Sequence, residues 1–414
     1  MKLNFKTVSK LAVATLATTG LVACGSGEQA SDTITLATWG SSPAEVTALE
    51  ATIASFTEAT GIKVEMEVIQ DKYMDVMKAR FAADNAPDVM YLDSFEAPGL
   101  AASGVLYDQA SSLTEQEDFY APLLDAFKGE EGQVWGAPKD YSTLALYVNT
   151  DLLSEAGYTT ADIPTTMEDF LPFLKDVQVK LPTGVGSMLV EKDLARHLDA
   201  FDAVGAEVIT EDGQANFAEN ADGKAYLQQL VDGKSEGYLH IAKDDLGSDS
   251  AIAAFGAGKA AMMIEGNWTL GALAQDFADL QFETLELPTI KGSQHTMAFT
   301  VGYAINNEAK NLDGAIEFVN YMTNEGQAEW TQGAGVLPSR QSVAEATDVA
   351  NDPLKAPHIA GADYATVWSR GTTLPVINTA FGNQFTAALN GMISVDEAVQ
   401  AIDKEANDEI ARQQ

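Results

Sequence analysis

Helical and strand-like hydrophobic periodicities alternate near the start of this chain, and this alternation limits the possible folds more than any other sequence feature. Apolar residues in 46–56 recur every three or four positions, as on one face of a helix, whereas those in 62–68 alternate with charged residues, as in a strand. Gly61 lies between the two segments, where a helix would end. A second helical pattern in 73–81 precedes a short apolar run in 89–92. With an extended segment before the first helix, this order predicts an α/β layer with right-handed crossovers.

The same alternation continues downstream. An extended stretch, 134–148, is followed by Thr165 and Glu168, whose spacing is that of a capping box at the start of a helix. Ser394 and Glu397 repeat this spacing before a polar helical segment. We therefore expect an α/β architecture along the whole chain.

Length and composition indicate how this architecture is divided. The 414 residues exceed what one hydrophobic core usually organises, and 46% of them are hydrophobic, so two globular domains are expected. The formal net charge of −37 leaves no basic stripe of the kind that nucleic acids or anionic lipid surfaces require. No nucleic acid is therefore expected among the partners.

The first 24 residues have the pattern of a bacterial export signal. Lys2, Lys6 and Lys10 precede an apolar run in 11–22, which is too short to span a bilayer as a helix. The sequence Leu-Val-Ala-Cys closes this run at Cys24 and matches the lipobox that a lipoprotein-specific peptidase recognises.

Cys24 is the only cysteine in the sequence, so it has no partner for a disulfide bond within the chain. We expect residues 1–23 to be removed as a lipoprotein signal peptide, Cys24 to carry a lipid such as palmitate, and 24–31 to form a short polar tether. This would anchor the protein on the extracellular face of a bacterial cell membrane. An ordinary secretory signal with a chance cysteine is the alternative.

Sequence patterns typical of catalysis are weak. The four histidines lie far apart in the sequence, and none has a partner at the spacing of metal ligands. Gly258 and Lys259 resemble the end of a phosphate-binding loop, but Ala253 and Ala260 replace residues that such a loop needs. We therefore predict no catalytic residue, no metal site and no cofactor. A pair of carboxylates at glycosidase separation remains an alternative, because the chain has 61 Asp and Glu residues.

Aromatic and carboxylate side chains follow or interrupt the predicted strands near their carboxyl ends, where open α/β sheets bind ligands. They are Trp39, Asp93, Glu96, Asp140, Tyr141, Glu265 and Trp268. Aromatic rings pack on the C–H face of a sugar, and carboxylates bond its hydroxyl groups. Packing in a hydrophobic core is the alternative for each aromatic residue taken alone. Together, the residues indicate a site for a carbohydrate.

Five segments carry a resemblance to a known family. They are 60–64, 86–89, 135–149, 258–268 and 335–340. In this order they resemble landmarks of the extracellular solute-binding proteins of ABC importers, the family that includes maltose-binding protein. The resemblance covers about residues 32–410.

The resemblance implies a periplasmic-binding-protein-like fold, in which two α/β lobes hold a ligand in the cleft between them. Lobe 1 would comprise 32–140 and 304–345, and lobe 2 would comprise 141–303 and 346–414. The chain would cross between the lobes near 140–144, near 299–304 and around 340–350.

By position in the matching segments, the resemblance also places the aromatic and carboxylate residues named above in the cleft. The stretch 368–378 would add Trp368, Arg370 and Asn378. Leu92 stands where maltose-binding protein has an aromatic residue, so the resemblance does not imply specificity for maltose.

The function that the resemblance implies is the capture of a neutral carbohydrate, such as an oligosaccharide, by closure of the two lobes about a hinge. The protein would be a monomer without enzymatic activity, and it would deliver its ligand to the transmembrane subunits of a permease. Three alternatives stay open: a binding protein for a non-sugar solute such as a polyamine, an exported glycosidase, and a surface adhesin.

Overall fold

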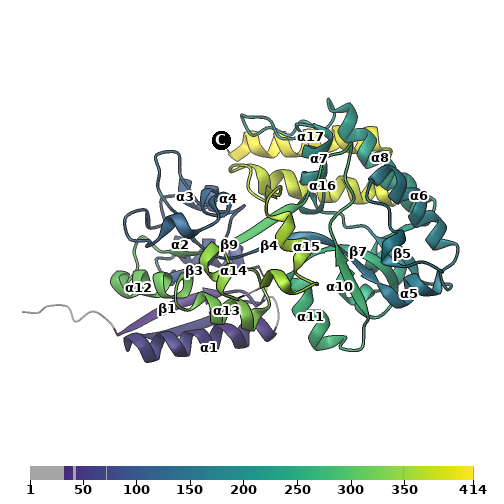
Figure 1. Cartoon of the computed structure of the whole chain (residues 1–414). Helices are drawn as coiled ribbons and strands as arrows, with labels where there is room; N and C mark the ends of the chain where they lie inside the picture. Colours follow the sequence, from purple (N-terminus) through teal and green to yellow (C-terminus); the bar gives the residue numbers. More distant parts are fainter. Residues whose placement is uncertain (1–31, 41–42, 71, 348, 414) are drawn as a thin grey trace, which may run out of the picture. The chain divides into compact units, whose positions relative to one another are not determined.

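The computed structural model describes residues 32–40, 43–70, 72–347 and 349–413 (Figure 1). The predicted signal peptide, Cys24 and the tether lie outside the described residues. The strands are β1 (Thr33–Thr38), β2 (Lys63–Val68), β3 (Val89–Asp93), β4 (Ala137–Asn149), β5 (Gly186–Leu189), β6 (Leu239–His240), β7 (Ala260–Gly266), β8 (Phe282–Leu285), β9 (Met297–Ile305) and β10 (Thr366–Val367). The helices are α1 (Pro43–Thr60), α2 (Tyr73–Ala82), α3 (Ala97–Ala102), α4 (Ala121–Asp125), α5 (Thr150–Glu155), α6 (Met167–Gln178), α7 (Leu198–Val204), α8 (Ala221–Ser235), α9 (Ala242–Leu246), α10 (Ala251–Gly256), α11 (Trp268–Asp276), α12 (Leu312–Thr323), α13 (Gln327–Ala334), α14 (Gln341–Thr347), α15 (Ala356–Gly361), α16 (Leu374–Leu389) and α17 (Val395–Gln413).

The strands of the described residues form one sheet in the order β2-β1-β3-β9-β4-β7-β5-β6, with β10 beside β9 and β8 beside β4. At one end, β1 pairs in parallel with β2 and β3, and at the other end β5 pairs in parallel with β6 and β7. The central strands β9 and β4 are antiparallel to each other and to β3 and β7. The predicted α/β class is confirmed, and helices alternate with the strands in both parallel regions.

Strand β4 joins the two parallel regions. It is 13 residues long, and its neighbour changes along its length. Residues up to Thr143 pair with β9, whereas residues from Leu144 onward pair with β7. In Figure 1, β4 lies with β9 between β3 and β7. One strand therefore belongs to both regions.

Buried apolar side chains gather in separate cores on the two sides of these central strands. One core contains residues from 34–137 and from 303–336. Another contains residues from 144–410, and a smaller cluster with Tyr147 packs on the opposite face of β4 and β7. The lobe boundaries expected from the sequence stay a prediction.

A buried carboxylate fixes the first strands to α12. Asp88, which is 4% exposed, accepts hydrogen bonds from the backbone N–H (2.8 Å) and the hydroxyl (2.7 Å) of Thr35 on β1. The other carboxylate oxygen accepts from the backbone N–H of Lys310 (2.6 Å) and of Asn311 (3.2 Å), just before α12. One side chain therefore joins three segments that are far apart in the sequence.

Two local predictions about helix ends are confirmed. Gly61 has φ +81°, and its N–H donates to the Thr57 carbonyl (2.9 Å), which ends α1. At the start of α17, the Ser394 N–H donates to the Glu397 carboxylate (2.8 Å), and the Glu397 N–H donates to the Ser394 hydroxyl (3.2 Å).

The predicted capping box of Thr165 and Glu168 is wrong by one residue. Thr166 precedes the first residue of α6, and its hydroxyl donates to the Asp169 carboxylate (3.2 Å). Thr165 stays outside the helix because its carbonyl accepts a hydrogen bond from the Thr289 N–H (2.8 Å).

None of the helices in the described part of the chain combines the length and the hydropathy that a bilayer span requires.

Candidate functional site

The loop after β3 carries the first carboxylate of the candidate site. Asp93 ends the strand, and its Oδ1 accepts a hydrogen bond from the Phe95 N–H (3.2 Å). Burial raises the pKa of Asp93 to about 7 despite this hydrogen bond. Glu96 directly follows Phe95 and forms an ion pair with Lys78 (3.3 Å). The loop thus presents one carboxylate paired with a lysine and one in a weakly hydrated place.

This loop is fixed to the segment that follows β10. The Ser94 hydroxyl donates to the Trp368 carbonyl (3.1 Å), and the Ser369 hydroxyl donates to the Ser94 carbonyl (3.3 Å). The Phe95 and Trp368 ring centroids are 6.0 Å apart. The sequence places these segments more than 270 positions apart, and the fold brings them into contact.

Two further aromatic rings continue from this contact into the second parallel region. Phe299 on β9 lies 6.5 Å from Trp368, and Trp268 packs edge-on against Phe299 at 5.4 Å. We call Phe95, Trp368, Phe299 and Trp268 the aromatic row. Trp368 is buried, whereas the other three rings are partly exposed. The row therefore extends from the carboxyl end of β3 to the carboxyl end of β7.

An arginine lies over the end of this row. Its guanidinium carbon, Cζ of Arg196, is 5.3 Å from the Trp268 ring centroid and 5.5 Å from that of Phe299, within the range of cation–π attraction. Arg196 also pairs with Glu265 (3.0 Å) and with Asp193 (3.6 Å).

A third carboxylate, Glu191, lies near this arginine. Burial raises the pKa of Glu191 to about 7, and repulsion by Glu265 and Asp193 adds to the rise. We call Glu191, Asp193, Arg196 and Glu265 the arginine–carboxylate group. It combines one cation with three carboxyl groups beside the aromatic row.

The predicted residues Asp93, Glu265, Trp268 and Trp368 therefore lie along one continuous set of contacts. Two other predicted residues, Asn378 and Arg370, contact neighbouring parts of the fold. Asn378 accepts a hydrogen bond from the Leu194 N–H (3.0 Å), which holds the turn that carries Arg196. Arg370 is exposed and pairs with Asp202.

The remaining predicted residues make their contacts elsewhere. Trp39 packs edge-on against Tyr73 (5.0 Å) and Tyr91 (5.2 Å) near the end of β1. Asp140 is buried, pairs with Lys139 and accepts a hydrogen bond from Trp330 Nε1 (3.0 Å).

Tyr141 is 2% exposed and packs against Tyr120 at 5.7 Å. Its contacts, with those of Asp140, place both residues inside the central strands rather than in the aromatic row. A role for Trp39, Asp140 and Tyr141 in ligand binding stays a prediction.

Sequence reasoning missed Glu191, Arg196 and Phe299. The first two follow β5, a strand of only four residues, Gly186–Leu189, whose carboxyl end lies beside that of β7. The charged stretch 191–193 directly after the apolar run 188–190 was the available indication. Phe299 lies within a strand, so no rule about strand ends could select it.

A buried histidine crosses the point where β4 changes partner. His358 Nδ1–H donates to the Thr143 carbonyl (2.7 Å), and the Thr143 hydroxyl donates to the His358 carbonyl (2.6 Å). In the neutral ring, Nε2 is an acceptor 3.0 Å from the Tyr147 hydroxyl, whose single hydrogen it shares with the Gly266 carbonyl (2.9 Å). Burial lowers the pKa of His358 to about 4.

This shift predicts an acid-dependent loss of stability. Between about pH 6.5 and pH 4, an unfolded His358 binds a proton and the folded one does not, so its contribution is complete above pH 6.5 and is lost as the pH falls. The lowered pKa corresponds to about 3 kcal/mol at most. In His358→Gln, whose amide can keep both hydrogen bonds without titrating, we expect a smaller loss of unfolding free energy between pH 7 and pH 4.5. Urea unfolding at both pH values measures the difference, and equal losses in the two proteins would contradict the assignment.

One sequence pattern and one structural observation bear on catalysis. Gly233, Ser235 and Gly237 have Gly-x-Ser-x-Gly spacing, but Ser235 ends helix α8 and strand β6 follows. A nucleophile elbow needs the opposite order, a strand followed by a helix. Among the residues that the structure describes, no group of three or more His, Cys, Asp and Glu side chains is arranged to hold a metal ion.

The family described as bacterial extracellular solute-binding protein matches residues 51–357, which is more than half of the chain. The chain belongs to this family. The family expected from the sequence is thus confirmed, and its members are described as binding proteins.

This solute-binding protein has relatives in several bacteria. A lactose-binding protein of Rhizobium radiobacter is 27% identical over 246 residues, which cover 57% of this chain and 56% of that protein. The match therefore spans little more than half of that relative's length. A maltooligosaccharide ABC transporter solute-binding lipoprotein of Streptococcus pneumoniae is 24% identical over 374 residues, which cover 84% of each chain.

Solved structures show the same fold. An ABC substrate-binding protein of Listeria monocytogenes, solved in complex with cycloalternan, has a TM-score of 0.81 at 18% identity, covering 92% of this chain and 99% of that one. The GacH receptor of Streptomyces glaucescens, solved unliganded and with acarbose, has a TM-score of 0.78 at 22% identity, covering 89% of this chain and 96% of that one. The predicted two-lobe, periplasmic-binding-protein-like fold is confirmed.

Proposed function

We propose that this solute-binding protein captures a neutral carbohydrate between its two lobes and delivers it to the permease of an ABC importer. The observation that carries the proposal is the aromatic row beside the arginine–carboxylate group, at the carboxyl ends of β3, β5 and β7. Aromatic faces suit the C–H faces of sugar rings, and the carboxylates and guanidinium suit their hydroxyl groups. The relatives include a lactose-binding protein and a maltooligosaccharide-binding lipoprotein, which supports the same class of ligand.

The proposed mechanism is closure about the central strands. A ligand between the Asp93 loop and Trp268 would contact both parallel regions at once, and only a closed arrangement offers both sets of contacts. The ligand would therefore shift the population toward the closed form. The hinge would comprise β4 and β9, with lobe 1 (32–140 and 304–345) and lobe 2 (141–303 and 346–414) moving about it.

We further propose that Cys24 carries a lipid anchor on the extracellular face of the cell membrane. The lipobox sequence supports this, and the Streptococcus pneumoniae relative is described as a lipoprotein. The protein would work as a monomer, without cofactor or catalytic step, and the permease subunits would be its partners.

A cationic solute such as a polyamine is the second candidate. It is favoured by the excess of carboxylates over cations in the arginine–carboxylate group and by Asp93 at the other end of the aromatic row. An ammonium ion would be attracted both by these carboxylates and by the aromatic faces.

A thermal-shift screen of residues 25–414 against mono- and oligosaccharides and polyamines tests the proposal. A ligand at 100 times its Kd stabilises by about 2.7 kcal/mol, which raises Tm by a few degrees. A shift with saccharides alone supports the proposal, and a shift with polyamines alone transfers the function to a cationic solute. Turnover of a glycoside in a reducing-sugar assay would instead indicate a glycosidase, and silence throughout would favour an adhesin.

Trp268→Ala is expected to weaken saccharide binding about 10- to 100-fold, because the variant loses the ring at one end of the aromatic row. Isothermal titration measures Kd directly. The matched control is Trp135→Ala, another partly exposed tryptophan that lies outside the row. Equal effects of the two substitutions would argue against the aromatic row as the site.

A further inference from the structure

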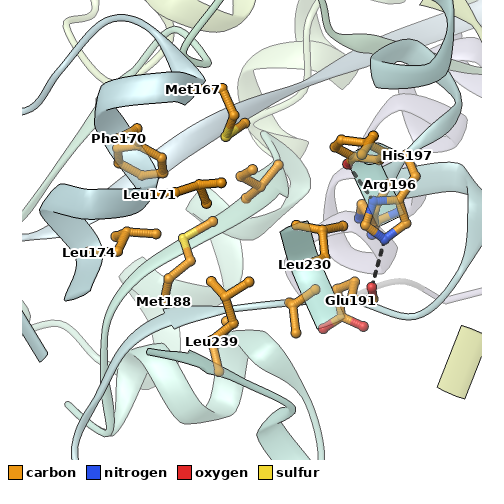
Figure 2. A pocket seen from close by; sticks show the side chains of 14 residues that line it. Met167, Phe170, Leu171, Leu174, Met188, Glu191, Arg196, His197, Leu230 and Leu239 are labelled. Carbon is orange, nitrogen blue, oxygen red and sulfur yellow. Dashed lines mark hydrogen bonds between the residues drawn. The ribbon is translucent and has the colours of Figure 1, made fainter. Parts of the chain in front are cut away.

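An apolar cavity of about 60 Å³ lies next to the arginine–carboxylate group (Figure 2). Its walls include Met167, Phe170, Leu171 and Leu174 from α6, with Met188 and Leu239 from β5 and β6. Figure 2 shows these apolar side chains facing one another across the space, whereas Glu191, Arg196 and His197 gather on one side.

The cavity lies at the same edge of the sheet as the candidate site. Met167 begins α6, and α6 packs on β5, the strand that follows it in the chain. A helix that precedes and packs on a strand in this way has its first turn near the carboxyl end of that strand, where Glu191 lies. Glu191 and Arg196 line the cavity and also belong to the arginine–carboxylate group.

The polar side of the cavity is rigidly held. His197 Nε2–H donates to the Glu191 carbonyl (2.7 Å), and His197 Nδ1 accepts from the Tyr226 hydroxyl (2.8 Å), as the dashed lines in Figure 2 show. The rim of the cavity includes Met167, Leu171 and Ile264. These apolar side chains are partly exposed, so the rim is not sealed by buried side chains.

The chemistry of the walls excludes sugar hydroxyl groups. A hydroxyl placed among these Leu, Met and Phe side chains would lose its hydrogen bonds to water without gaining others. A group of a few carbon atoms fits instead, since one water-sized sphere needs about 10–15 Å³. The two methionines can adjust to the shape of such a group.

We propose that this cavity is a subsite for a small apolar aglycone, such as a phenyl group, carried by the saccharide in the candidate site. The inference rests on the proposed function and deepens it by naming the class of ligand as a glycoside with an apolar substituent. The sugar would contact the aromatic row, the glycosidic linkage would pass Glu191 and Arg196, and the substituent would enter between α6 and β5.

Isothermal titration of lactose, maltose and their phenyl glycosides tests this subsite. In the unmodified protein we expect a phenyl glycoside to bind about tenfold or more tightly than its parent sugar, because the phenyl group leaves water. Leu171→Phe, which fills the cavity from its rim, should remove this gain and leave the affinity for the parent sugar unchanged. Ile264→Phe is a second filling variant in case the first does not fold. Leu312→Phe, a partly buried helical position in the other core, is the matched control and should keep the gain.

Benzyl alcohol separates failure of the subsite from failure of the proposed function. Its binding is followed by the NMR signals of the ¹³C-labelled methyl groups of Met167 and Met188. If the sugars bind but their phenyl glycosides bind no more tightly, or if the gain survives in Leu171→Phe, the subsite is overturned and the proposed function stands. A second outcome is that no sugar or glycoside binds, but benzyl alcohol causes saturable methyl shifts in the unmodified protein and none in Leu171→Phe. This result would uphold the cavity as an apolar site and overturn the carbohydrate function. Absence of such shifts would then overturn both.

Discussion

Replacing Asp88 by alanine is expected to lower the free energy of unfolding by about 3 to 5 kcal/mol, one of the two largest effects on stability that we predict. The carboxylate accepts four hydrogen bonds from two other segments, and three of the donors are backbone N–H groups that the variant leaves without this acceptor. Hydrogen bonds to a charged group are stronger than those between neutral groups, and an unsatisfied buried donor is costly. The loss should therefore exceed that of an ordinary surface substitution.

Urea unfolding of the Asp88→Ala variant measures this loss. Asp279→Ala is the matched control, because Asp279 is exposed, and we expect it to change the unfolding free energy by less than about 0.5 kcal/mol. Asp88→Asn should fall between the two, since its amide oxygen can accept from only some of the four donors. A loss below about 1 kcal/mol in Asp88→Ala would show that water replaces the carboxylate without much cost.

Arg196→Met is expected to reduce both stability and ligand affinity. It would leave Glu265, which is 5% exposed, without its cation, and removal of one partner of a buried pair typically costs about 3 to 5 kcal/mol. The raised pKa of Glu191 should rise further, because Arg196 now opposes the repulsion from Glu265 and Asp193. Saccharide binding should weaken as well, since the guanidinium also lies over Trp268 and Phe299.

The double variant Arg196→Met/Glu265→Gln separates the two effects. If the lost stability comes from the uncompensated carboxylate, the double variant should recover at least half of it in urea unfolding, while ligand affinity stays low. Arg370→Met is the control for loss of an arginine, because its ion pair with Asp202 is exposed and should contribute at most about 1 kcal/mol. If the loss of unfolding free energy in the double variant equals the sum of the losses in Arg196→Met and Glu265→Gln, the proposed coupling between Arg196 and Glu265 is contradicted.

Local signals in the sequence were sufficient for the class of fold and for part of the site. The alternation of periods in 46–56 and 62–68 predicted α1 and β2, because burial of one helix face or one strand face imposes the spacing directly on the sequence. The rule that ligands bind at the carboxyl ends of strands selected Asp93, Glu265 and Trp268, which the structure places along one set of contacts.

Long-range pairing decided the rest. The change of partner within β4 at Thr143 and Leu144 depends on strands more than 100 residues away, and no local period encodes it. The same is true of Arg196, whose place over Trp268 depends on the parallel pairing of β5 with β7. Asp140 and Tyr141 are the opposite case, because the sequence suggested a place in the cleft for both. The pairing of β4 with β9 instead places them among buried neighbours.

The sequence by itself determined that this is an α/β chain of the solute-binding family with aromatic and acidic groups at strand ends, since short-range periodicity and segment order carry that information. Only the tertiary structure decided which of these groups meet. Contacts such as Ser94 with Trp368 join segments through sheet register, and register is set by the packing of whole regions rather than by neighbouring residues.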